Sequence, residues 1–127
     1  MAKEIIKTDK APAPIGPYNQ AVKYGGLLFV SGQIAINPET GTLECDDIQM
    51  ETALVMKNIQ AVLRRAGMRM GQVLKCSIFL KDMDLFPLVN KVYSSFFPEG
   101  MEPARETIEV ARLPKDVNVE ISVIAAE

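Results

Sequence analysis

The N-terminal third of the chain consists of short apolar runs separated by turn residues, a pattern typical of β-strands. Residues 27–30 (LLFV) lie between Gly25-Gly26 and Ser31-Gly32, so we expect a buried strand that ends at Ser31-Gly32. The Gly-Gly pair also separates this run from residues 20–24, which predicts a β-hairpin. Prolines at 12, 14 and 17 disfavour regular structure over residues 11–18. This segment is predicted to be a stiff, extended arm that presents Tyr18 at its end.

Two later segments repeat their apolar positions every three or four residues, which predicts amphipathic helices. The first covers residues 52–66, with Asp46 or Asp47 able to cap its start and Gly67 suited to the left-handed position after its end. The second opens at Asp84, tolerates Pro87 in its first turn and stops at Pro98. Its predicted apolar stripe is Leu85, Val89, Val92, Tyr93 and Phe96.

Three further segments alternate apolar and polar residues as strands do, namely residues 74–81, 104–110 and 117–125. The sequence leaves open whether residues 4–8 form a short extra strand. Strands alternating with two amphipathic helices indicate one sheet with both helices packed on one face. On the opposite, open face we expect Phe79, Thr107 and Ile124, and this apolar content favours its partial covering by another subunit.

Composition and charge exclude several classes of function. The 127 residues carry 14 Lys and Arg against 16 Asp and Glu, a net charge of −2, which does not support a footprint for duplex nucleic acid. The chain has no histidine, which excludes Ser-His-Asp and Cys-His catalysis and HExxH metal sites. Cys45 and Cys76 cannot form a four-ligand zinc site by themselves and are expected to be reduced thiols. With no signal-peptide core and no apolar run of membrane-spanning length, we expect one soluble, cytoplasmic domain over residues 1–127.

The charged residues of the last two strands are candidates for chemistry. Arg105 begins a strand after Pro103-Ala104, where its planar guanidinium could hold a carboxylate with two hydrogen bonds. Thr107 and Glu109 share its strand face, and Glu120 on the last strand could activate a water as a general base. The alternative is a solvated surface ion pair. The short connection permits a hairpin between these strands, and a return past an intervening strand stays open as the alternative.

Other polar positions are less specific. Tyr18 could equally be a packed residue of the arm, and Asn90 is expected to face solvent unless an interface covers it. The backbone N–H groups of Ser31-Gly32 could bind an anion or a carbonyl oxygen. A further acidic group is interpreted as a solvated helix start, because it lacks the spacing of a calcium loop. Its members are Glu44, Asp46, Asp47 and Glu51.

Taken together, the motifs resemble the reactive intermediate/imine deaminase family, also called the YjgF/YER057c/UK114 family. The resemblance spans nearly the whole chain. It rests on five segments in the same order: residues 14–21 (PIGPYNQA), 29–34 (FVSGQI), 89–93 (VNKVY), 103–105 (PAR) and 110–120 (VARLPKDVNVE).

The resemblance implies an α+β, chorismate-mutase-like domain that forms a homotrimer, with three sites in clefts between subunits and no cofactor or metal. It further implies hydrolysis of enamine and imine acids such as 2-aminoacrylate and 2-aminocrotonate to 2-keto acids and ammonia. In this interpretation Arg105 clamps the substrate carboxylate and Glu120 positions the attacking water. The resemblance also assigns pocket positions to Tyr18, Ser31, Gly32, Asn90 and Thr107.

This chain departs from the family pattern at two positions, because many members carry Cys where it has Thr107 and Ser where it has Glu106. The departure leaves the volume of the pocket open. Two other functions remain open beside the deaminase. One is a translation-inhibiting endoribonuclease, although nucleic acid is a poor match to the charge. The other is a non-catalytic keto-acid sensor or chaperone-like binder that uses the same cleft.

Overall fold

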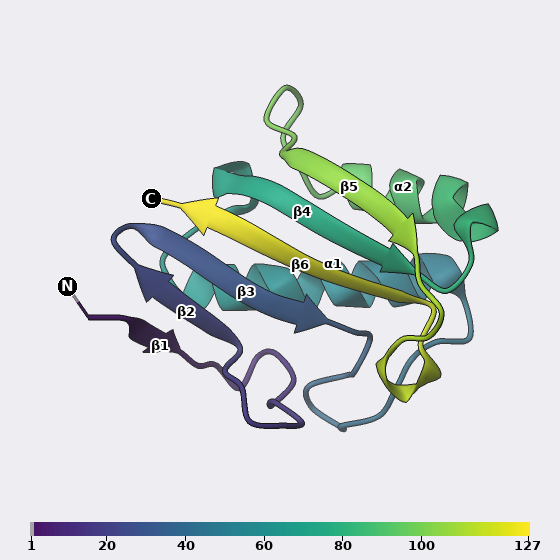
Figure 1. Cartoon of the computed structure of the whole chain (residues 1–127), viewed down its shortest axis with the longest axis horizontal. Coiled ribbons are helices and arrows are strands. Elements are labelled where there is room, and N and C mark those ends of the chain that lie inside the picture. Colours follow the sequence, from purple (N-terminus) through teal and green to yellow (C-terminus); the bar gives the residue numbers. More distant parts are fainter. Residues whose placement is uncertain (1) are drawn as a thin grey trace.

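A computed structural model describes residues 2–127, in which six strands form one mixed sheet and two helices cover one of its faces (Figure 1). The order across the sheet is β1-β2-β3-β6-β4-β5, with β4 and β5 parallel and all other neighbours antiparallel. The predicted α+β class, the hairpin and the extra first strand are confirmed. The elements are β1 (Glu4–Ile6), β2 (Ala21–Tyr24), β3 (Leu27–Gln33), α1 (Ile48–Arg65), β4 (Val73–Leu80), α2 (Phe86–Ser94), β5 (Ala104–Glu109) and β6 (Val119–Ala126).

The ends of the helices follow from their capping residues. The side chain of Asp47 accepts hydrogen bonds from the backbone N–H groups of Gln49 and Met50 at 2.8 and 3.0 Å, and Gly67 after α1 has φ of 77°. The predicted start of the second helix at Asp84 is wrong. Asp82 instead caps a 3₁₀ turn over Met83–Leu85, and α2 begins only at Phe86.

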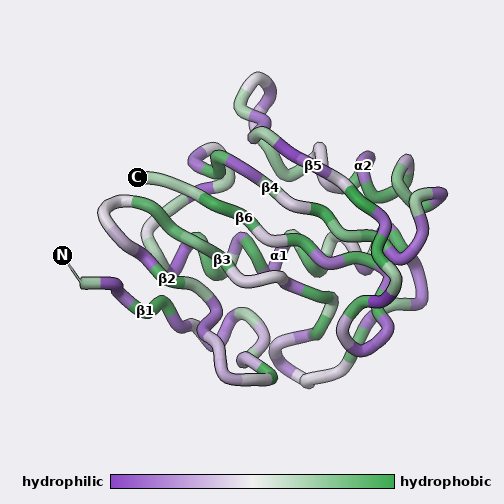
Figure 2. The backbone as a smooth tube through the Cα atoms, in the orientation of Figure 1, coloured by the Kyte–Doolittle hydropathy of each residue, from purple (hydrophilic) through white to green (hydrophobic). Residues whose placement is uncertain are grey.

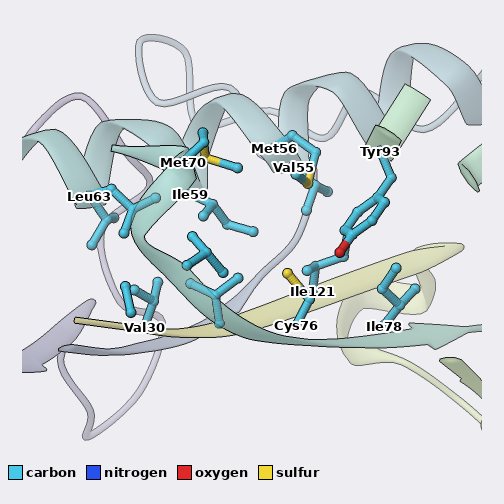
Figure 3. Packing of buried hydrophobic residues seen from close by; sticks show 14 of the residues in the cluster. Val30, Val55, Met56, Ile59, Leu63, Met70, Cys76, Ile78, Tyr93 and Ile121 are labelled. Carbon is cyan, nitrogen blue, oxygen red and sulfur yellow. The ribbon is translucent and has the colours of Figure 1, made fainter. Parts of the chain in front are cut away.

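The hydrophobic core lies between the sheet and the helices. Figure 2 shows hydrophobic and hydrophilic residues alternating along the strands, as expected when one sheet face is buried. Figure 3 shows Val55, Met56 and Ile59 of α1 above the sheet residues Val30 and Ile121. Within residues 2–127 no helix has the length and apolar character required to span a membrane.

The open face of the sheet carries large apolar side chains. Phe29 is 45% exposed and Ile108 is 46% exposed, and they lie opposite the half-buried Ile124 and Phe79 in the strand register. The prediction for Phe79 and Ile124 is therefore confirmed. The prediction for Thr107 is wrong, because the parallel register of β4 and β5 pairs it with the buried Ile78 on the helix side.

Ser31 and Gly32 lie inside β3 rather than at its end. The pairing of β3 with β6 runs from Val30↔Val123 to Gln33↔Ile121, so β3 contains one extra residue. This β-bulge bends the strand and lets it continue to Gln33, which corrects the predicted strand end.

The interpretation of Glu51 as part of a solvated helix start is also wrong, since this side chain is fully buried. Its carboxylate accepts hydrogen bonds from Asn118 Nδ2 at 2.7 Å and from the backbone N–H groups of Asn118 and Val119 at 2.9 and 3.3 Å. These bonds satisfy a buried charge and join the start of α1 to the start of β6.

Candidate functional site

Glu120 lies on the open face of the sheet in a small hollow with Tyr18 and Gly32, which we call the Glu120 hollow. Its volume is about 50 Å³, enough for bound water, and its wall includes the proline arm and Pro114. Gly32 is required here because a Cβ at this position would lie 2.8 Å from Cδ and Oε2 of Glu120. The bulged, side-chain-free backbone of β3 thus makes the space that the carboxyl group occupies.

The environment of Glu120 makes its carboxyl group a candidate acid or base. Burial raises its pKa above the ordinary glutamate value of 4.5. Among residues 2–127 it forms no ion pair that would oppose this effect. A carboxyl group with a raised pKa beside a water-sized space is the arrangement expected of a general acid or base.

The proline arm that carries Tyr18 is held by Gln20. The buried amide of Gln20 donates to the carbonyl oxygens of Thr8, Ala11 and Pro12 and accepts from the N–H of Thr8. Tyr18 Oη accepts a hydrogen bond from the N–H of Ile15 at 3.3 Å. These contacts fix a segment that has no regular secondary structure, so Tyr18 lies beside Glu120 in a defined position.

Ser31 contributes to the same region. Its hydroxyl donates to the carbonyl oxygen of Asn19 at 2.6 Å, and its backbone N–H donates to the carbonyl oxygen of Gln20 at 2.9 Å. Both bonds tie the bulge to the end of the proline arm. The hydroxyl oxygen can still accept a further hydrogen bond.

Arg105 lies on the helix side of β5 in a second hollow of about 360 Å³, which we call the Arg105 hollow. Its Nη1 donates a 2.6 Å hydrogen bond to Oδ1 of Asn90. Its guanidinium carbon lies 5.2 Å from the ring centre of Phe86 and 5.0 Å from that of Tyr93. The hollow is lined by Asn90, Tyr93, Ser94, Glu102, Pro103 and Arg105.

The other two residues on this face of β5 have different surroundings. The hydroxyl of Thr107 is buried and finds no hydrogen-bond partner among residues 2–127. The carboxylate of Glu109 accepts from the N–H of Met83 at 2.9 Å, so it supports the turn before α2. Thr107 therefore retains an unused polar group near Arg105, whereas Glu109 is occupied.

Within one chain the Glu120 hollow and the Arg105 hollow lie on opposite faces of the sheet. Strand β4 lies between β5 and β6, which resolves the alternative that the sequence leaves open. Arg105 pairs with the buried Cys76, whereas Glu120 pairs with Phe79 on the other face, so the two charged groups project from opposite faces of the sheet. The structure brings Tyr18, Gly32 and Glu120 together in one hollow, and Arg105 with Asn90 in the other.

A third, larger hollow contains none of the predicted residues. It is an open groove of about 1240 Å³ between the end of α1 and the segment after α2, and no carboxylate lines it. Residues 2–127 contain no group of three or more His, Cys, Asp or Glu side chains placed to hold a metal ion.

Sequence reasoning missed three contributors to the site. Gln20 was treated as part of a strand, and its four hydrogen bonds depend on the path of the arm, which no periodicity encodes. The sequence predicts Tyr93 only as part of the apolar stripe and does not single out Phe86, although both rings lie against Arg105. Their spacing of four and three residues from Asn90 places all three on one helix face, a signal that could have identified them.

The chain is similar to known proteins over nearly its whole length. Residues 8–127 match the family model described as Endoribonuclease L-PSP. A RutC family protein of Pyrococcus abyssi is 51% identical over 125 residues, which cover 98% of each chain. TdcF of Escherichia coli, provisionally named a reactive intermediate deaminase, is 42% identical, covering 97% of this chain and 96% of its own.

Solved structures agree with the sequence matches. A protein of the conserved Rid family, YyfA of Yersinia pestis, superposes with a TM-score of 0.96 at 46% identity, covering 99% of this chain and all of that one. The structure of Escherichia coli TdcF with bound serine gives a TM-score of 0.92 at 41% identity, covering 98% of both chains. Sequence, fold and topology therefore agree, and the chain belongs to the reactive intermediate deaminase (RidA/YjgF/UK114) family, whose family model is described as Endoribonuclease L-PSP.

Proposed function

We propose that this protein hydrolyses reactive enamine and imine acids, such as 2-aminoacrylate and 2-aminocrotonate, to 2-keto acids and ammonia. The observation that carries the proposal is the half-buried carboxyl group of Glu120, whose pKa is raised by burial and which lies over Gly32 beside a water-sized space. A general base with these properties, contributing roughly 10²–10⁴-fold, suits an electrophile as reactive as a protonated imine.

The complete site requires more than one chain in this proposal. Arg105 and Glu120 project from opposite faces of one sheet, and the open face exposes Phe29 and Ile108. Packing three copies through these apolar faces would bury them, and because Arg105 lies on the edge strand β5, its hollow would meet the Glu120 hollow of a neighbouring subunit at that edge. A homotrimer with three intersubunit sites is the assembly that we infer.

The chemistry then divides between the two half-sites. Arg105 holds the substrate carboxylate, and Asn90 fixes the guanidinium. The enamine tautomerises to the imine, Glu120 directs water to C2, and the carbinolamine collapses to the keto acid and ammonium. Water supplies the oxygen, and nitrogen leaves with its protons, so no oxidant or reductant takes part. Tyr18 borders the water and orders the proton path.

The bound serine of TdcF, a small molecule with a carboxylate, supports a site for amino-acid-sized ligands here. The carboxylate-binding hollow of about 360 Å³ is compatible with such a ligand.

A coupled assay tests the proposal. Threonine dehydratase generates 2-aminocrotonate, and the appearance of 2-ketobutyrate is timed with and without this protein. We expect acceleration by the parent protein, a loss of roughly 10²-fold or more in kcat for Glu120→Gln, and retained binding of 2-ketobutyrate by that variant. Glu39→Gln, which changes an exposed loop carboxylate, is the matched control.

Arg105 is tested in the same assay by a change that keeps the charge. Arg105→Lys is expected to raise KM strongly, because an ammonium cannot form the planar, two-bond contact with a carboxylate. The exposed Arg69→Lys is its control. Equal activity of Arg105→Lys, Glu120→Gln and the parent would refute the assignment. Binding of 2-ketobutyrate without any acceleration by the parent would establish a sensor instead.

A further inference from the structure

Three side chains of α2 contact Arg105 from one face of the helix. Phe86, Asn90 and Tyr93 are separated by four and three residues, which places them along one stripe. Asn90 supplies the 2.6 Å hydrogen bond to Nη1, and the two rings lie 5.2 and 5.0 Å from the guanidinium carbon. Both ring distances are within the range of a cation–π contact, which is about 6 Å or less.

The two rings are themselves held in place. Tyr93 is only 4% exposed and packs on Phe97 with ring centres 4.9 Å apart. Phe86 is half-buried and packs on the hydrophobic core. Figure 3 shows Tyr93 extending from α2 toward the sheet, where Cys76 and Ile78 lie. An exposed arginine therefore lies against two rings that pack on the core.

An exposed arginine requires this kind of support to act as a clamp. Its long side chain loses rotamer entropy when it is ordered. One hydrogen bond to Asn90 fixes the position of Nη1 but leaves the plane of the guanidinium free to turn about it. Ring contacts oppose that rotation, so the ordering occurs before a ligand arrives.

We propose that Phe86 and Tyr93 are positioning residues that set the plane of the Arg105 guanidinium for a planar carboxylate. The ring of Tyr93 is the part that lies 5.0 Å from the guanidinium carbon, whereas its buried hydroxyl, near Cys76 and Arg105, forms no hydrogen bond of normal geometry among residues 2–127. The identity of the ligand rests on the proposed function, whereas the ordering of Arg105 does not.

The test compares variants that remove a ring with variants that keep it, in the full-length protein. Phe86→Leu and Tyr93→Leu remove one ring each, and Phe86→Tyr and Tyr93→Phe retain them. Phe96→Leu is the control, because Phe96 is also half-buried against the core but lines the groove after α1 instead of the Arg105 hollow. The probe is 2-ketobutyrate, with Kd measured by titration calorimetry.

We expect each ring-removing variant to raise Kd about three- to fivefold, equivalent to about 0.7–1 kcal/mol, and the double variant to raise it roughly 10- to 25-fold. The ring-keeping variants and Phe96→Leu should bind as the parent does. In the assay KM should rise while kcat stays near the parent value. Unchanged Kd in the ring-removing variants, or an equal rise in Phe96→Leu, would overturn the proposal.

A second measurement does not depend on the ligand. The NMR signal of the Arg105 Nε–H group should report an ordered side chain shifted by ring currents, and both features should diminish in Phe86→Leu and Tyr93→Leu. If Arg105→Ala leaves 2-ketobutyrate binding intact, the proposed carboxylate clamp fails, and the NMR result still decides the positioning role. If Arg105→Ala abolishes binding while the ring-removing variants match the parent in Kd and NMR, only the positioning role fails.

Discussion

Replacing Gly32 by alanine should displace the Glu120 side chain while leaving residue 120 itself a glutamate. The added Cβ would lie 2.8 Å from Cδ and Oε2 of Glu120, a separation that Cβ atoms essentially never show in folded proteins, and 3.1 Å from its Cγ. The backbone itself presents no obstacle, since Gly32 is not among the glycines with positive φ. The clash therefore falls on the carboxyl group, which must leave the Glu120 hollow.

The expected cost in stability is small compared with the cost in activity. Glu120 is half-buried and can rotate toward solvent, so overpacking should cost at most about 1–2 kcal/mol, partly offset by the lower entropy of the unfolded alanine chain. Displacement of a general base removes a factor of roughly 10²–10⁴ from turnover. We therefore expect a folded variant with kcat reduced at least about 100-fold.

The pH profile distinguishes displacement from general damage. Burial raises the pKa of Glu120, so the acid limb of kcat/KM in the parent lies above pH 4.5. A carboxyl group moved into solvent regains its ordinary pKa, and the residual activity should keep an acid limb shifted to lower pH. The stability of the fold changes with pH in the opposite direction to the activity. The contribution of Glu120 to the free energy of unfolding is fully present below the pKa that this group has in the unfolded chain, and it is lost as the pH rises through the higher pKa of the folded state.

Gly71→Ala is the matched control, because its Cβ would meet only the ends of Met101 and Pro98, at 3.6 and 3.7 Å. A double-mutant cycle adds a second check. Gly32→Ala should lower the activity of Glu120→Gln very little, since both changes remove the same function. Full activity of Gly32→Ala with the parent pH profile would refute the reasoning.

Three more predictions concern the fold and the assembly. Glu51→Leu orphans buried N–H donors of Asn118 and Val119, so urea unfolding should show a loss of about 3 kcal/mol, and a loss below about 1 kcal/mol would contradict this. Lys115 has φ of 54°, a left-handed conformation that glycine adopts with less strain than lysine. Lys115→Gly should therefore raise the free energy of unfolding measured in urea by about 0.5 kcal/mol, and a lower urea midpoint would contradict the inference that the backbone is strained here. Phe29→Asp should convert the proposed trimer into a folded, inactive monomer by light scattering, and an unchanged oligomeric state would exclude this face as the interface.

Elements with a strong local signal were predictable from the sequence. The alternating strands and the repeat of α1 specify their buried faces directly, and Asp47 and Gly67 mark the ends of that helix. The start of α2 was misplaced because two aspartates, at 82 and 84, offer similar caps and only the fold selects between them. Thr107 was placed on the wrong face because register between parallel strands is not encoded in either strand alone.

The sequence supplies the candidate residues of the site but not their arrangement in space. The charged strand positions and the resemblance both propose Arg105 and Glu120, whereas the position of β4 between their strands, and hence their opposite faces, depends on long-range pairing. The burial of Glu51 also depends on long-range contacts. An acidic residue near the start of a helix is normally solvated, and Glu51 is buried because the backbone N–H groups of residues 118 and 119, far away in the sequence, donate hydrogen bonds to it.

The separation of the two half-sites allows a decisive experiment on the assembly. Each site in the proposed trimer takes Arg105 from one subunit and Glu120 from its neighbour, so Arg105→Ala and Glu120→Gln subunits carry complementary defects. Mixing them in equal amounts by joint refolding from urea gives every ordered pair of neighbours equal weight, and about one site in four then has both native groups. Activity should return to about a quarter of the parent value, although each variant alone is nearly inactive. A site within one chain would give no recovery at all, because no subunit of the mixture carries both groups.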